Sequence, residues 1–210
     1  MYQTKWVDAD EGRLSELIDW DKVWASVHVS FYTEELKSTI WDQIHLNFYT
    51  TYNYNKWHRS FQPCPLCNKI PEDVYHLIFD CKFTKIMWKK IEVVLFKITP
   101  TSLTDLEKAV GLQLKKGKDE CATILRNWLT FSLRHLIMQE ERRAYHIKDY
   151  YLRSVEKFVV KFNFKVQEEL KAKKLIYDHR GAPGKFEDIV TYNNVVASVE
   201  NGVFIWRDLM

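Results

Sequence analysis

Four side chains that can bind a metal ion lie within eighteen residues of the chain. They are Cys64, Cys67, His76 and Cys81, in the spacing C-x2-C-x8-H-x4-C. Three thiolates and one imidazole are donors that structural zinc sites use, and four protein donors leave no coordination position for a reactive water. The spacing therefore predicts one structural zinc ion rather than a catalytic one.

The residues around these donors predict how they come together. Two cysteines separated by two residues can turn both sulfurs toward one ion, and Pro63 and Pro65 restrict that turn because proline fixes φ. Pro71, followed by two acidic residues, predicts the start of a short helix. We expect His76 to project from this helix and Cys81 to follow its end, so that all four donors reach one ion.

Other interpretations of the same residues stay open. Cys64 and Cys67 alone could be a redox pair of the C-x-x-C type, although no βαβ pattern surrounds them. His76 and Cys81 could be ordinary core residues. The close spacing of all four donors favours zinc over both alternatives. The fourth cysteine of the chain, Cys121, lies outside the set, and we expect it to be a buried thiol.

The elements that must position these residues are predicted to be mainly helices. With 6 Gly and 5 Pro in 210 residues, the composition argues against a loop-rich all-β fold. Apolar residues at helical spacing predict helices over residues 14–24, 34–48, 82–96, 119–145 and 151–174. Thr33 is expected to cap the second of these. Residues 178–184 are expected to form a linker, and Asn201 with Gly202 between two apolar runs predicts a β-hairpin.

The sequence therefore predicts a mainly α fold, a multi-helix domain with a small CCHC zinc-binding loop and a short C-terminal β-hairpin. Four segments follow from the composition and the motifs. They are an N-terminal helical segment that packs on the zinc region (residues 1–63), the CCHC zinc-binding module (64–96), a helical region with a basic stripe (97–180), and a linker with the hairpin tail (181–210).

Net charge is distributed unevenly along the chain. The overall formal charge of +3 is too small to identify a nucleic-acid-binding protein. Residues 1–63, however, carry 6 basic and 9 acidic side chains, a net charge of −3, whereas residues 142–180 carry 11 and 5, a net charge of +6. The sequence therefore combines an acidic N-terminal part with a basic helical segment.

Two sets of basic residues are candidates for contacts with a nucleic-acid backbone. Lys82, Lys85 and Lys89 share one face of the helix that follows Cys81, and Lys90 lies beside them. The second set is Arg153, Lys157, Lys161 and Lys165, spaced four residues apart. Contacts from these side chains to phosphates would give salt-dependent, sequence-tolerant binding. Solvent-exposed faces of amphipathic helices would show the same pattern, so that alternative stays open.

The metal-binding motif resembles the zinc-binding domain at the C-terminal end of non-LTR (LINE-type) retrotransposon reverse transcriptases. The resemblance rests on Cys64-x-x-Cys67, the acidic pair Glu72-Asp73, the run His76-Leu77-Ile78-Phe79, Cys81 and Trp88. Helices on both sides extend it to about residues 20–145. The resemblance implies one bound zinc and a role in holding template RNA and target DNA during target-primed reverse transcription.

The chain also departs from that family. In the family an upstream polymerase domain carries a pair of adjacent aspartates that holds catalytic magnesium, and no Asp-Asp pair occurs in these 210 residues. Neither a His-Glu-x-x-His motif nor a phosphate-binding loop is present. The scattered side chains of His28, His45, His58, Asp42 and Glu34 have no catalytic spacing. The sequence therefore predicts a binding fragment of a reverse transcriptase and not an enzyme.

Two functions follow from these patterns. The first is binding of RNA or DNA through the backbone, next to an upstream polymerase domain of the same polyprotein. The alternative is a zinc-stabilised helical protein-interaction module with no nucleic-acid binding of its own. The sequence contains neither a run of about eighteen apolar residues nor a signal peptide. We therefore expect an intracellular protein, nuclear or cytoplasmic, with no membrane partner.

Overall fold

The computed structural model describes residues 19–45, 50, 57–58, 63–69, 73–113, 117, 119–147 and 154–210, and for residues 142–147 it describes the backbone alone. In chain order the elements are α3 (Trp20–Val27), α4 (Glu34–Ile44), the π-helical turn η1 (His76–Asp80), α6 (Lys82–Ile98), α7 (Asp105–Val110), α8 (Glu120–Ile147), α9 (Val155–His179), α10 (Pro183–Val190), the 3-10 turn η3 (Tyr192–Asn194), β1 (Ala197–Glu200) and β2 (Val203–Trp206). Over these residues the fold is mainly helical with a two-stranded antiparallel sheet, as predicted.

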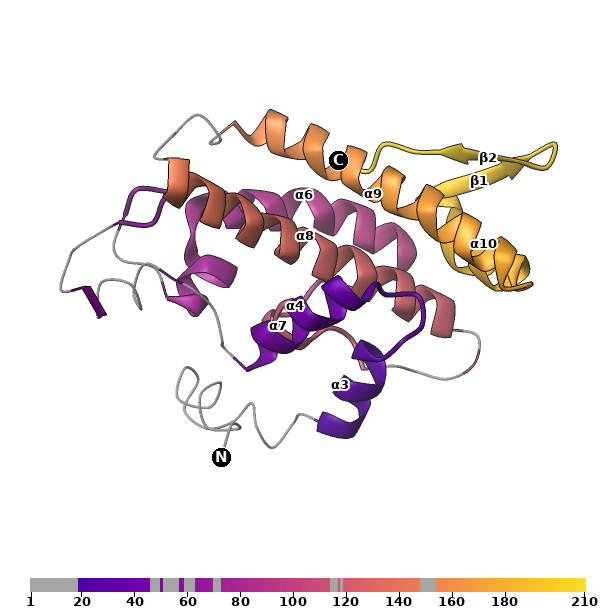
Figure 1. The fold of residues 1–210 in the computed structure, drawn as a ribbon, viewed down its shortest axis with the longest axis horizontal. Coiled ribbons are helices and arrows are strands. Elements are labelled where there is room, and N and C mark those ends of the chain that lie inside the picture. Colours follow the sequence, from indigo (N-terminus) through magenta and orange to yellow (C-terminus); the bar gives the residue numbers. More distant parts are fainter. Residues whose placement is uncertain are drawn as a thin grey trace.

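Helix α8 lies at the centre of the described fold (Figure 1). Helices α4, α6, α9 and α10 all contact it. Residues 122–138 of α8 are buried without interruption, so polar groups there must find partners inside the protein. The indole N–H of Trp128, for example, donates to the carboxylate of Glu169 on α9 (3.0 Å). No described helix, α8 included, is both long and apolar enough to cross a membrane.

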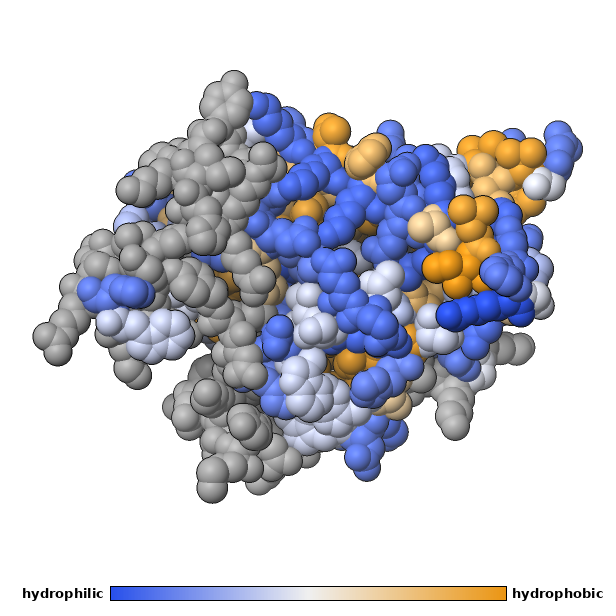
Figure 2. Space-filling view, in the orientation of Figure 1, coloured by the Kyte–Doolittle hydropathy of each residue, from blue (hydrophilic) through white to orange (hydrophobic). Residues whose placement is uncertain are grey.

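The surface over the described elements is mostly hydrophilic, with apolar patches near the hairpin and the end of α9 (Figure 2). Exposed apolar side chains there include Leu175 and Ile176 on α9 and Val203 and Ile205 on β2. On the opposite face of the hairpin, Phe204 packs against Phe186 of α10, with ring centroids 5.8 Å apart. The hairpin is therefore attached to the helical core through one of its two faces.

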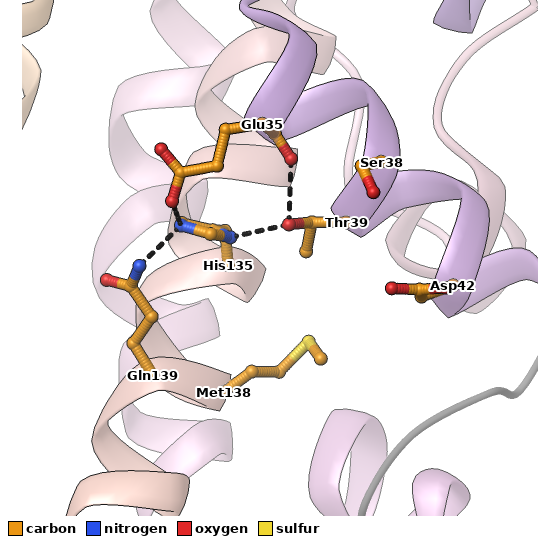
Figure 3. A pocket seen from close by; sticks show the side chains of 7 residues that line it. All are labelled: Glu35, Ser38, Thr39, Asp42, His135, Met138 and Gln139. Carbon is orange, nitrogen blue, oxygen red and sulfur yellow. Dashed lines mark hydrogen bonds and ion pairs between the residues drawn. The ribbon is translucent and has the colours of Figure 1, made fainter.

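A chain of polar contacts joins α4 to α8 and α9 around His135 (Figure 3). Lys165 donates to the amide oxygen of Gln139 (3.0 Å), and the amide nitrogen of Gln139 lies 2.7 Å from Nε2 of His135. Nδ1 of His135 lies 2.9 Å from the hydroxyl of Thr39, which also lies 2.9 Å from the carbonyl of Glu35. Nε2 of His135 also lies 3.3 Å from a carboxylate oxygen of Glu35. Together these contacts hold α4 against the central helix.

Several predicted elements are confirmed. The hydroxyl of Thr33 caps α4 by accepting the N–H of Leu36 (3.2 Å). Helices α6 and α8 end within two residues of the predicted ranges. Asn201 and Gly202 both have positive φ (52° and 79°), as a type I′ hairpin turn requires, and Ala197 pairs with Trp206 in the resulting ladder.

The prediction of a linker at residues 178–184 is wrong. Helix α9 continues to His179, and α10 begins at Pro183. Gly181 has φ 68°, and the N–H groups of Gly181 and Ala182 donate to carbonyls in the last turn of α9 (3.1 and 3.0 Å), which closes that helix. Proline fits the first turn of α10 because its missing N–H is not needed there. These turn-forming residues therefore join two helices directly.

Arg126 ties the centre of α8 to the end of α6. Its guanidinium is fully buried and donates to the carbonyls of Leu95, Thr99 and Thr101 (3.2, 2.9 and 3.1 Å). The carbonyl of Leu95 also accepts the N–H of Thr99 (3.0 Å), and the last carbonyls of α6, those of Lys97 and Ile98, accept from the amide of Asn193 (3.0 and 3.4 Å). Burial lowers the pKa of Arg126, and the carboxylate of Glu107, 3.7 Å away, opposes that shift. Arg126 thus joins α8 to the end of α6 and to the two threonines that follow it.

Replacing Arg126 by Leu should lower the free energy of unfolding by about 3 kcal/mol, because three buried carbonyl groups lose a charged donor. Urea-induced unfolding followed by circular dichroism measures this difference. Arg207→Leu, at an exposed position of the tail, is the matched control and should change the free energy of unfolding by no more than about 0.5 kcal/mol. Equal effects of the two substitutions would contradict the role assigned to Arg126.

Candidate metal centre

The four residues predicted as ligands lie together. The sulfurs of Cys64, Cys67 and Cys81 and a ring nitrogen of His76 are all within 4.8 Å of one another. Cys67 is half-buried and the other three are buried. Sulfurs around a tetrahedral zinc ion are about 3.8 Å apart, since each Zn–S bond is about 2.3 Å long. The four residues therefore form a compact site whose size and donor set fit one zinc ion.

The first two ligands lie on a tight loop. The N–H of Asn68 donates to the carbonyl of Cys64 (2.7 Å), and the N–H of Cys64 donates to the carbonyl of Lys69 (3.2 Å). Asn68 has φ 57°, a left-handed conformation that asparagine adopts more readily than most residues with a side chain. Leu66, at the tip, is buried. These bonds close the loop with both sulfurs on the side of His76 and Cys81.

The other two ligands are aligned by the π-helical turn η1. The N–H of Cys81 donates to the carbonyl of His76 (2.7 Å), a contact between residues five apart. In an α-helix, residues five apart would be rotated by about 140° and would face different directions. The wider π turn brings Cys81 over His76 on one side. A carboxylate oxygen of Asp73 fixes the start of this turn by accepting the N–H of His76 (2.6 Å).

Trp88 fastens the turn η1 to helix α6. Its indole N–H donates to the carbonyl of Ile78 (2.7 Å), and both residues are buried. Cys81 immediately precedes α6, and its carbonyl accepts the N–H of Lys85 (2.9 Å) as the first bond of that helix. The last ligand and the start of α6 are therefore fixed together.

The thiols of the site differ in acidity. A hydrogen bond from the thiol of Cys64, assisted by His76, lowers the pKa of Cys81 to about 4, although burial opposes this shift. Burial raises the pKa of Cys67, whose sulfur lies 3.4 Å from Nε2 of His76. A thiolate is thus favoured at Cys81, and thiolate is the form that binds metal. All four cysteines are free thiols. Cys121 is half-buried, so the prediction of a buried thiol there is wrong.

The two predicted sets of basic residues lie in different surroundings. Lys82, Lys85, Lys89 and Lys90 are all exposed on the first half of α6, directly after Cys81. In the second set, Lys157 is exposed on the first turn of α9, and Arg153 lies outside the described residues. Lys161 forms an ion pair with the buried carboxylate of Glu140, and Lys165 donates to Gln139. Both of these lysines thus contact α8.

The ligands were predictable from the sequence, but the groups that orient them were not. The π turn and the hydrogen bond from the N–H of His76 to the carboxylate of Asp73 were not predicted. The H-x4-C spacing was the available signal for the π turn, because a contact between residues five apart is the one that defines this turn. The sequence marks Trp88 through the family resemblance, but its bond to the carbonyl of Ile78 required the structure.

Replacing Cys81 by Ser should reduce the zinc content of the purified protein from one ion per chain to less than one. Serine is a poor zinc ligand, and three donors bind the ion more weakly than four. Metal analysis by mass spectrometry measures the content. Cys121→Ser is the matched control and should keep the full complement. A fully loaded Cys81→Ser protein would rule out the site.

Replacing Trp88 by Phe should lower the free energy of unfolding of the zinc-loaded protein by about 2 kcal/mol, because the buried carbonyl of Ile78 loses its donor. Chemical denaturation in the presence of zinc measures this. Trp41→Phe, at a half-exposed position on α4, should have a much smaller effect. A Trp88→Phe protein as stable as Trp41→Phe would show that the indole bond does not hold the turn.

Comparison with known proteins agrees with this geometry. Residues 5–88 match the family described as zinc-binding in reverse transcriptase. No curated protein and no solved structure matches the chain. The matched residues include all four ligands and end at Trp88. The resemblance inferred from the sequence is thus confirmed for residues 5–88, which match the zinc-binding family of reverse transcriptases.

Proposed function

We propose that this chain is a zinc-stabilised nucleic-acid-binding module of a reverse transcriptase that holds RNA or DNA by the phosphate backbone and has no polymerase activity of its own. The observation that carries the proposal is the position of four exposed lysines, Lys82, Lys85, Lys89 and Lys90, directly after the metal ligand Cys81. Because Cys81 immediately precedes α6, a zinc ion bound to Cys81 would fix the direction in which these lysines point.

Within the described residues, the positive charge on this face of α6 is compensated only in part, by Asp80 beside Lys85 and by Glu156 of α9 near Lys90. Among the described residues, Lys85 alone of the four lysines forms an ion pair, with Asp80 at 3.0 Å. Both partners of that pair are about half exposed, so the pair is weak and can exchange its carboxylate for a phosphate. Phosphate contacts from flexible lysines give affinity without sequence preference.

The start of α9 extends the same surface. Phe83 near the start of α6 packs edge-on against Phe158 of α9, with ring centroids 5.3 Å apart. This contact brings the first turn of α9, with the exposed Lys157, next to the lysines of α6. We keep Lys157 and Arg153 as candidate backbone contacts. Lys161 and Lys165 contribute less to binding in this proposal, because Glu140 and Gln139 of α8 already occupy their ammonium groups.

The proposal assigns binding and not chemistry to this chain. The sequence has no adjacent aspartates to hold catalytic magnesium, so the polymerase activity would belong to an upstream domain of the same polyprotein. That domain is the proposed protein partner. RNA or DNA held by α6 would be presented to it, and the zinc would serve as a structural support.

A second candidate is a protein-interaction module without nucleic-acid binding. One observation favours it. Trp41 is 48% exposed on α4 and lies against Trp24 and His45, with ring centroids 5.0 and 3.9 Å away. Exposed aromatic groups of this kind are enriched at protein interfaces. The surrounding residues 1–63 have a net charge of −3, from 6 basic and 9 acidic side chains, which disfavours phosphate contacts there.

Substituting both Lys82 and Lys89 by Gln should weaken binding of single-stranded RNA and DNA. It should also reduce the slope of log affinity against log salt by about 1.4, or about 0.7 for each lost phosphate contact. Fluorescence anisotropy with labelled oligonucleotides at several salt concentrations measures both quantities. The control is Lys97→Gln with Lys185→Gln, which makes the same change in charge at exposed positions in the last turn of α6 and on α10.

Affinity that does not change between low and physiological salt would refute this proposal, and so would equal losses in the two double variants. A zinc-loaded, helical wild-type protein that binds neither RNA nor DNA would favour the interaction module instead.

A further inference from the structure

A second charged site lies at the opposite end of α9. A cavity of about 330 Å³ is formed where the loop before α4 meets the last turns of α9. Three cationic side chains line it, Lys37, Lys173 and Arg180, together with one carboxylate, Glu34, and several hydroxyl groups. None of these residues belongs to the zinc cluster or to the lysine face of α6.

The positive charge of this cavity is partly buried. Lys173 is 5% exposed, donates to the carbonyl of Phe31 and lies 3.2 Å from Glu169. Burial lowers the pKa of Lys173, the carboxylate of Glu169 opposes that shift, and the positive charge of Lys37 adds a smaller lowering effect. Two ammonium groups thus repel each other across the lining. An anion bound between them would relieve that repulsion.

The one carboxylate in the lining, that of Glu34, does not block an anion from entering the cavity. The side chain of Glu34 is 89% exposed and pairs with Lys37 at 2.7 Å, so it is directed largely to solvent. Arg180, which follows the last residue of α9, is exposed and forms no ion pair within the described residues. The carbonyls at this end of α9 accept the N–H groups of Gly181 and Ala182, which reduces their repulsion of an anion.

Hydrogen-bond donors converge on the same cavity. Thr33 caps α4, an eleven-residue helix, so the unpaired N–H groups of its first turn and its positive dipole end lie at the lining. Tyr177 also lines the cavity, while its hydroxyl is sealed from solvent and has no hydrogen-bond partner among the described residues.

We propose that this cavity binds a phosphoryl group, held by Lys37, Lys173 and Arg180 and by the start of α4. A phosphoryl group carries negative charge and several acceptor oxygens, which matches three cationic groups and several N–H and O–H donors around one small space. The group could come from a free phosphate or nucleotide, or from the backbone of a nucleic acid that reaches this end of the molecule.

The surface beside the cavity suits a ligand with an apolar part. Leu175 and Ile176 are 70% and 47% exposed and line a neighbouring hollow together with His179 and Arg180. Ile176 and Arg180 line both spaces, so the two lie next to each other. Apolar and hydrophilic side chains lie side by side at this end of α9 (Figure 2). A base or sugar attached to the phosphoryl group would rest there.

Calorimetric titration of the zinc-loaded full chain tests the proposal with three probes. They are inorganic phosphate, adenosine monophosphate, and the dinucleotide ApA, which has a phosphodiester and no terminal phosphate. Arg180→Gln should weaken binding about ten-fold, because the phosphoryl group loses a charged donor. The matched control, Arg207→Gln in the tail, should leave it unchanged.

The probes also identify the source of the group. Binding of phosphate and the mononucleotide but not of ApA supports a free ligand, whereas binding of ApA at the same site supports a nucleic-acid backbone. The Lys82→Gln and Lys89→Gln double variant should bind all three probes as the wild type does, which separates this site from the α6 surface. The proposal is overturned by a wild-type protein that binds none of the probes saturably, or by equal effects of Arg180→Gln and Arg207→Gln.

Discussion

The hydrogen bond from the N–H of Cys81 to the carbonyl of His76 is the contact on which the metal centre depends. It joins residues five apart, and only a turn of that width places an imidazole and a thiol on the same side when four residues separate them. The same bond ends η1 at Cys81, the residue that immediately precedes α6. The geometry of the ligands and the direction of the α6 lysines are therefore set by one local feature of the backbone.

The parts of the fold that were predictable depend on short-range physics. Thr33 caps the helix that follows it. Asn201 and Gly202 readily adopt left-handed backbone conformations, and these form the hairpin turn. The zinc ligands could be predicted because few residue types bind zinc and their spacing is restricted. In each case the signal and the structure that it specifies lie within a few residues.

The parts that were not predicted depend on contacts distant in sequence. The turn at Gly181 allows either a linker or a tight helix–helix junction, and packing of Phe186 in the core decides for the junction. Lys161 and Lys165 read as part of a basic stripe, but Glu140 and Gln139 of α8 draw them inward. Nor does any local pattern show that Arg126 caps the end of α6 from 25 to 31 residues away.

The packing of helix α4 shows how far the folding unit that contains the zinc loop extends along the chain. This helix lies within the residues that match the zinc-binding family, yet it packs on α8, which lies outside them. Thr39 contacts His135, and Gln43 donates to the sulfur of Met138 (2.8 Å). A polypeptide cut after Trp88 would expose Ile40 and the rest of the apolar face that α8 covers. The cooperative unit that carries the zinc loop is thus larger than the sequence signature by which the loop is recognised, and α8 is part of it.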